Sequence, residues 1–108
     1  MIALDSTLAA LAEPTRRRVV DLLLERPRRP GELSAEIEMS PPALSRHLRV
    51  LRREGLIEES RVDEDARVRV YRLRPERFRE LQAWLERMEV FWSEQLDAFK
   101  GHVERGRH

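Results

Sequence analysis

The sequence predicts a mainly α-helical domain with one small β-hairpin, in the order four helices, two strands and a final helix. Leucines recur every three or four residues through much of the chain, which is the spacing of one buried helix face. Residues 67–73 instead alternate charged and apolar side chains, the pattern of a half-buried strand. At 108 residues, the chain has room for a single domain, residues 1–108, with a modest core.

Composition narrows the class of protein. The chain has no cysteine, which excludes disulfides, thiolate metal sites and thiol catalysis. Neither a signal peptide nor an apolar run of membrane-spanning length is present, so we expect a cytoplasmic protein without membrane contact. No nucleophile and base stand in a recognisable arrangement, and an enzyme is not expected.

Positive charge is concentrated in the middle of the chain. Residues 16–53 hold 10 arginines and 5 acidic residues, a net charge of +5, whereas the whole chain carries +1. Of the 21 basic residues only Lys100 is a lysine, so genomic base composition can account for part of the arginine excess. A cationic segment of this kind is expected where a surface meets phosphates and releases counterions.

Two short helices are predicted at the start of the chain. Ser6 is predicted to cap a helix over residues 7–12, which is too small to stand alone and must pack on something. Glu13-Pro14 ends it, and a second helix is predicted from Thr15 to about Arg26. The second helix has a broad core face formed by Val19, Val20, Leu22, Leu23 and Leu24.

Arg16, Arg17 and Arg18 crowd the first turn of the second helix. Cations at a helix N-terminus oppose the helix dipole, so the cluster costs stability unless a negative group compensates it. Either DNA phosphate or an acid elsewhere in the fold can do so.

A helix over residues 40–54 is the most clearly marked element. Ser40 can cap its first turn, and Pro41 at the first helical position gives up only an amide that has no intrahelical partner. Gly55 can take the left-handed closing conformation after a last turn with two arginines, whose charge suits the negative end of the dipole. Both ends of this helix are therefore specified locally.

The two faces of this helix differ in chemistry. One carries a stripe of leucines, Leu44, Leu48 and Leu51. The other carries Pro42, Ala43, Ser45, Arg46 and Arg49. Small residues allow close approach to the DNA major groove, and arginines can bond guanine edges or phosphates. An ordinary amphipathic surface helix would share this pattern, so the neighbouring segments decide between the two.

The preceding segment favours DNA binding. Residues 31–37 predict a short helix with Leu33 and Ile37 inward, and only two residues separate it from Ser40. Two short helices joined by such a turn form a helix-turn-helix, whose second helix, the recognition helix, enters the groove.

Residues 56–73 predict a β-hairpin, which after a helix-turn-helix forms a wing. Period two places two arginines of its second strand on the same face as Tyr71 and Leu73. The turn, residues 63–66, holds three acids that phosphates repel, so we expect the tip to project past the duplex. Contact with DNA is then expected from Arg61, Arg67 and Arg69.

A last helix is predicted from Pro75 to about Val103. Apolar residues recur at heptad spacing from Phe78 to Phe99, interrupted at Gln95, and further aromatics widen the stripe. The helix either lies on its own core or forms a subunit interface with the apolar first helix, and the excess of large aromatics favours the interface. The residues predicted to form this interface are Leu4, Leu8, Leu11, Leu81, Trp84, Leu85, Met88, Phe91, Trp92 and Phe99.

Four stretches spread along the chain carry a family signal. They are Leu11-Ala12-Glu13-Pro14-Thr15-Arg16, then Leu44-Ser45-Arg46-His47-Leu48-Arg49-Val50-Leu51-Arg52 with Gly55-Leu56-Ile57, and Val70-Tyr71-Arg72-Leu73. Together they resemble the ArsR/SmtB family of bacterial winged-helix repressors, over nearly the whole chain. The resemblance implies a winged helix-turn-helix fold and a homodimer joined through its first and last helices. It also implies an operator with inverted-repeat symmetry and release by an effector.

The resemblance assigns roles by position. It implies that the groove-facing residues are Ser40, Pro42, Ala43, Ser45 and Arg46. His47 matches the family's histidine, and for this residue two interpretations stay open. It contacts DNA, or, next to Leu48 at the edge of the buried stripe, it packs and hydrogen-bonds within the motif.

The chain departs from the family's metal sensors. Their Cys-x-Cys pair before the recognition helix is absent, and the last helix lacks the paired His and acid spacing of their zinc site. His102 with Asp97, or His108 with Glu104, offers at most a weak site across a dimer. We therefore expect no metal and no cofactor, and the last helix resembles the metal-independent branch of the family.

The sequence thus predicts a sequence-specific DNA-binding transcriptional regulator, a homodimeric repressor or autorepressor whose effector is unknown. One alternative is a metal-responsive repressor with a site on the C-terminal helix. Another is a winged helix that serves as a protein-interaction module, which the acidic wing tip favours.

Overall fold

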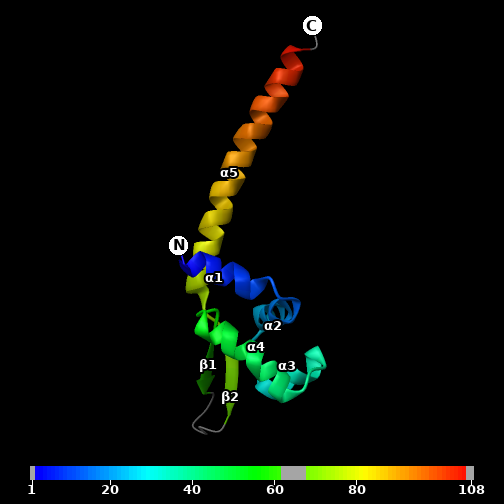
Figure 1. The fold of residues 1–108 in the computed structure, drawn as a ribbon, viewed down its shortest axis with the longest axis vertical. Helices are drawn as coiled ribbons and strands as arrows, with labels where there is room; N and C mark the ends of the chain where they lie inside the picture. Colours follow the sequence, from blue (N-terminus) through cyan, green and yellow to red (C-terminus); the bar gives the residue numbers. More distant parts are fainter. Residues whose placement is uncertain (1, 62–67, 107–108) are drawn as a thin grey trace. The chain divides into compact units, whose positions relative to one another are not determined.

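The computed structural model describes residues 2–61 and 68–106, and it confirms a mainly helical chain with one hairpin (Figure 1). The described residues divide between two compact units, Met1–Phe78 and Arg79–His108. The elements in order are α1 Ile2–Leu11, α2 Pro14–Glu25, α3 Pro30–Ile37, α4 Pro41–Arg53, β1 Ile57–Arg61, β2 Arg69–Leu73 and α5 Pro75–Arg105. None of these helices combines the length and apolar content that crossing a membrane requires.

The helix-turn-helix consists of α3, a short turn and α4. Glu38 ends α3 with φ of 59°, a left-handed conformation, and its amide donates to Ala35 O at 3.3 Å. The amide of Met39 donates to Ser34 O at 3.1 Å, which closes the last turn of α3. The next residue, Ser40, already caps α4. Local hydrogen bonds therefore fix the turn that sets the direction of α4 relative to α3.

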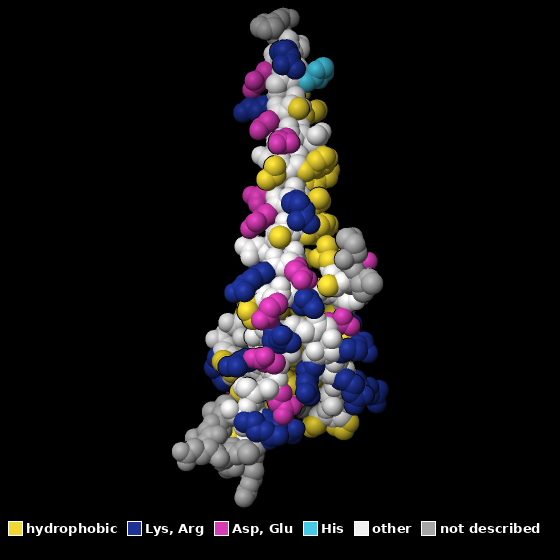
Figure 2. Space-filling view, turned by 90° about the vertical axis from the view of Figure 1, so that its left-hand side faces the viewer, with side chains coloured by type: hydrophobic (Ala, Val, Ile, Leu, Met, Phe, Trp, Pro, Cys, Tyr) yellow, Lys and Arg dark blue, Asp and Glu magenta, His cyan; other side chains and the backbone are white. Residues whose placement is uncertain are grey.

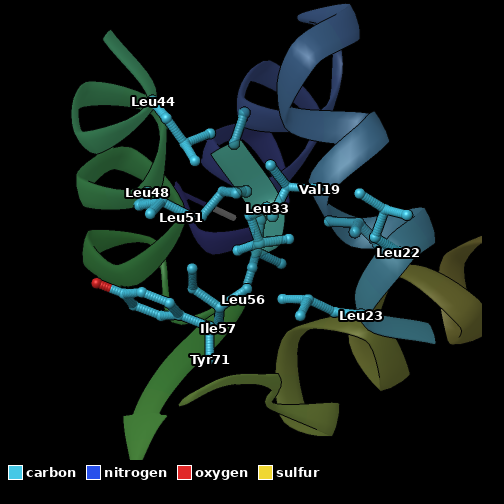
Figure 3. Close-up of a cluster of buried hydrophobic side chains, with 12 residues drawn as sticks. Val19, Leu22, Leu23, Leu33, Leu44, Leu48, Leu51, Leu56, Ile57 and Tyr71 are labelled. Atoms are coloured by element: carbon cyan, nitrogen blue, oxygen red, sulfur yellow. The ribbon is translucent and has the colours of Figure 1, made fainter. Parts of the chain in front are cut away.

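The core of the first unit lies between α2, α3, α4 and the base of the hairpin (Figure 3). Leu33, Leu51 and Leu56 are fully buried in it. Truncating a leucine at such a site to alanine costs about 2–5 kcal/mol. The other buried apolar residues are Ala10, Val19, Val20, Leu22, Leu23, Leu44, Leu48, Ile57 and Tyr71. The predicted stripe of α4 is therefore the side of that helix that the core covers.

Two expectations about the first helices were wrong. The first helix begins at Ile2 and not after Ser6, and Thr7 lies in mid-helix, where its buried hydroxyl donates to Ala3 O at 2.8 Å. Leu24 is not a core residue and is 69% exposed. It lies one position past Leu23, about 100° further round the helix and beyond the face that the core covers.

The hairpin is a two-stranded antiparallel sheet. Glu59 pairs with Tyr71 and Arg61 with Arg69, so side chains of Glu59, Tyr71 and Arg69 share one face. Arg28, between α2 and α3, adds an isolated bridge, because its amide donates to Tyr71 O at 3.1 Å and its carbonyl accepts from Tyr71 N at 2.8 Å. The hairpin is thereby tied to the helices that precede it.

The second unit is the part of α5 from Arg79 onward. It exposes large apolar residues, Leu85, Val90, Phe91, Trp92, Leu96 and Phe99. Phe91 and Trp92 form an edge-to-face pair with ring centroids 5.2 Å apart. Figure 2 shows hydrophobic side chains along one side of this helix. Within this unit the described residues include no buried side chain, so its apolar surface faces solvent in a single chain.

Candidate nucleic-acid interface

Helix α4 is held at both ends by the residues that the sequence marks. Ser40 Oγ accepts from the amide of Ala43 at 3.4 Å, and Pro41 occupies the first turn. Gly55 has φ of 75°, and its amide donates to Arg52 O at 3.0 Å. The amide of the next residue, Leu56, donates to Leu51 O at 2.9 Å. This pair of closing bonds is the Schellman motif, and both predicted helix ends are confirmed.

The outer face of α4 is open to solvent. Ser45, Arg46 and Arg49 are exposed, whereas Ala43 is only partly so. Ser40 and Pro42 are also exposed. Within the described residues, neither the Arg46 nor the Arg49 side chain has a hydrogen bond or ion pair, which leaves both guanidinium groups available to an external anion or base. The face that was predicted to enter the groove is thus polar and cationic, and no side chain among residues 2–61 and 68–106 binds its two guanidinium groups.

His47 lies on the inner edge of α4, as the second of its two interpretations expects. Its side chain is mostly buried, with Nδ1 3.5 Å from Glu13 Oε2 and 3.5 Å from Arg16 Nη1. Glu13 Oε2 also accepts from the amide of Arg16 at 3.0 Å and so caps α2. The three side chains form one polar cluster between the start of α2 and the recognition helix. A role of His47 in binding DNA directly stays a prediction.

Two of the arginines at the start of α2 donate hydrogen bonds that offset their unfavourable position at the positive end of the helix dipole, and the sequence did not suggest these acceptors. Arg16 Nε donates to Ala10 O at 2.7 Å, and Arg17 Nη1 donates to Leu11 O at 3.1 Å. Both acceptors are carbonyls at the C-terminal end of α1, where the helix dipole is negative. Two arginines therefore cap the preceding helix. A phosphate contact by Arg16 stays a prediction.

Glu13 has a pKa below its ordinary value of 4.5. Burial raises this pKa, but the amides of Arg16 and Thr15 and the charges of His47 and Arg16 lower it by more. A carboxyl whose pKa falls on folding stabilises the folded state above its unfolded pKa, and the contribution is lost as pH falls through the folded pKa. Glu13 should therefore stabilise the cluster at neutral pH and cease to do so in acid.

We expect Glu13→Gln to remove part of the acid sensitivity of folding. The free energy of unfolding, measured by urea titration between about pH 6 and about pH 3, should fall less steeply with acid in the variant than in the wild type. Glu36→Gln is the matched control, because the Glu36 side chain is exposed and has no polar contact within the described residues. Equal slopes for the wild type and Glu13→Gln would contradict the expectation.

The wing contributes two predicted arginines, Arg61 and Arg69, and one carboxylate that the sequence did not single out. Arg69 is exposed at the start of β2, on the face toward α4. Its Nη1 lies 3.5 Å from Glu59 Oε1, and Glu59 Oε2 lies 3.4 Å from Arg52 Nη1 on the last turn of α4. Arg61 is exposed at the end of β1. The prediction for Arg67 and for the acidic turn 63–66 lies outside the described residues.

A hollow of about 330 Å³ separates α4 from the wing. Ser45 and Leu48 line its α4 side, and Tyr71 lines its wing side. A second hollow, of about 470 Å³, continues past Arg49 and Arg53. Together they form a groove with a polar and cationic rim beside the recognition helix.

The residues predicted to join two subunits are found on α1 and α5. Leu8 and, on α5, Leu85, Phe91, Trp92 and Phe99 are exposed. Leu4, Leu11, Leu81, Trp84 and Met88 are partly buried. Val90 is as exposed as Trp92 at 58%, but two helix positions correspond to about 200°, so it does not belong to this stripe. Among the described residues, no group of three His, Asp or Glu side chains is placed to hold a metal ion.

The chain is similar in sequence to known bacterial regulatory proteins. The family model described as "Bacterial regulatory protein, arsR family" matches residues 13–59, from the cap of α2 into β1. The HTH-type transcriptional regulator Rv2034 of Mycobacterium tuberculosis is 36% identical over 96 residues, which are 88% of this chain and 83% of the relative. The transcriptional activator HlyU of Vibrio cholerae is 44% identical over 50 residues, 46% of each chain.

A solved structure agrees with the fold as well. The ArsR-like transcriptional regulator from Rhodococcus sp. RHA1 superposes with a TM-score of 0.73 at 27% identity, over 92% of this chain and 91% of that one. The matched relatives carry the names of transcriptional regulators, not of enzymes.

Proposed function

The chain belongs to the bacterial arsR family of regulatory proteins, and from that premise we propose that it is a homodimeric, sequence-specific DNA-binding repressor. The observation that carries the proposal is the outer face of α4. Three buried leucines and two local caps hold that helix, while Arg46 and Arg49 face solvent without an internal partner among the described residues. Small and cationic side chains on a fixed helix suit the major groove.

A dimer with two-fold symmetry has two recognition helices, and we therefore propose that its operator is an inverted repeat. The exposed apolar residues of α5 support a two-fold interface, because an apolar surface of this size costs free energy in water. A symmetric dimer presents its two recognition helices to two half-sites about one helical turn apart. We place the operator upstream of the protein's own gene, so that the repressor also limits its own synthesis, and an effector releases it.

Salt dependence of binding tests this function. The measurement is the dissociation constant for DNA upstream of the chain's own coding region, and for a random duplex of equal length, at several salt concentrations. We expect tighter binding to the upstream DNA and a steep linear fall of log affinity with log salt, because each phosphate contact releases counterions. A protein-interaction module predicts no binding and no slope, and that result would reject the proposal.

A further inference from the structure

A carboxylate lies between the recognition helix and the wing. Glu59 projects from β1 on the face that it shares with Tyr71, and Tyr71 Oη donates to Glu59 Oε2 at 3.5 Å. The same oxygen lies 3.4 Å from Arg52 Nη1, and Glu59 Oε1 lies 3.5 Å from Arg69 Nη1. One acid thus contacts an arginine of α4 and an arginine of β2, which are 17 positions apart in the sequence.

Burial distinguishes the acid from its two partners. The side chain of Glu59 is 15% exposed, whereas those of Arg52 and Arg69 are each 52% exposed. The carboxylate therefore lies beneath two guanidinium groups that remain open to solvent. All three residues line the hollow of about 330 Å³ beside the recognition helix, together with Ser45.

We propose that Glu59 is a positioning residue, which holds Arg52 and Arg69 side by side so that they bind one stretch of the DNA backbone. This inference rests on the proposed function. A free arginine side chain loses rotamer freedom when it binds phosphate, and two arginines fixed in advance lose less. The fixed pair also sets the register of α4 in the groove, since phosphate contacts orient a protein on the duplex.

The charge of Glu59 gives the proposal a distinctive signature. A carboxylate near DNA repels phosphate, so an acid without a positioning role only weakens binding, and its neutralisation should tighten binding to every sequence. A positioning role predicts the opposite for the operator. Loss of the charge would then weaken specific binding even though the net charge of the protein becomes more positive.

Glu58 provides the matched control. It is the neighbouring residue of β1, so its side chain lies on the opposite face of the hairpin. There it contacts Arg72 Nε at 2.7 Å and Arg74 Nε at 3.7 Å. Glu58→Gln and Glu59→Gln change the net charge equally, and each leaves an amide of nearly the same size.

The test compares both variants on upstream DNA and on a random duplex. We expect Glu59→Gln to weaken operator binding about tenfold, the scale of one hydrogen bond to a charged group, while its binding to random DNA is unchanged or tighter. We expect Glu58→Gln to bind the operator at least as tightly as the wild type. If Glu59→Gln binds the operator as tightly as Glu58→Gln does, the positioning role is rejected.

Two further measurements separate positioning from folding and from the function itself. In a background that combines Arg52→Ala and Arg69→Ala, Glu59→Gln should cause no further loss, and a persisting tenfold loss would mean that Glu59 acts through the hairpin. In the free protein, NMR order parameters of the Nε–H groups of Arg52 and Arg69 should fall in Glu59→Gln. Unchanged order parameters would overturn the inference, even if the wild type binds no DNA and the proposed function has failed separately.

Discussion

Replacing Arg46 by alanine should weaken operator binding by about 1–3 kcal/mol and relax the preference for one base pair in each half-site. Arg46 is exposed on the face of α4 opposite the buried leucines and has no polar partner within the described residues. Its planar guanidinium can donate to O6 and N7 of one guanine together. The measurement is binding to a set of operators in which each base pair is changed in turn.

Arg49→Ala is the matched comparison for Arg46→Ala. Arg49 lies three residues further along α4 and lines the hollow of about 470 Å³, where we expect it to contact phosphate. Its loss should weaken binding to all sequences alike and reduce the salt slope by about one per subunit. If Arg46→Ala instead weakens operator and random DNA equally, Arg46 is a phosphate contact, and Ser45 with the Pro42-Ala43 surface reads the bases.

Replacing Trp92 by alanine should weaken the proposed dimer by about 3–5 kcal/mol, because we propose that the indole is buried in the subunit interface. In a single chain Trp92 is 58% exposed and stacks edge-on against Phe91. A loss of about 3 kcal/mol raises the dissociation constant more than a hundredfold, which sedimentation equilibrium at low micromolar protein detects as monomer.

Val90→Ala is the control for Trp92→Ala. Val90 is also 58% exposed, but two positions along a helix correspond to about 200°, so it lies on the other side of α5. This variant should remain as dimeric as the wild type. A fully dimeric Trp92→Ala protein would instead show that the aromatic stripe does not form the subunit interface.

Much of the recognition helix was predictable because its determinants are local. Ser40, Pro41 and Gly55 act on backbone groups within five positions, so their identities alone place both ends of α4. The leucine stripe follows from helical periodicity, and the hairpin follows from alternation. The prediction was wrong for the start of α1, which begins at Ile2 and not after Ser6. It was also wrong for Leu24, because the width of the α2 face that the core covers depends on tertiary packing.

The polar contacts around the recognition helix were decided by the tertiary structure alone. Arg16 and His47 are 31 positions apart, yet their side chains meet at Glu13. The sequence offered phosphate or an acid as compensation for Arg16, and the fold supplies the carbonyl of Ala10 as well.

The sequence by itself determined which residues of α4 are buried and which are exposed, because periodicity and caps act along one helix. Only the tertiary structure decided which exposed arginines have internal partners. Arg52 is held by Glu59, whereas Arg46 has no such partner among the described residues. The physical reason is that a helical period fixes the direction of a side chain, while its partner depends on which distant strand or helix is packed opposite it.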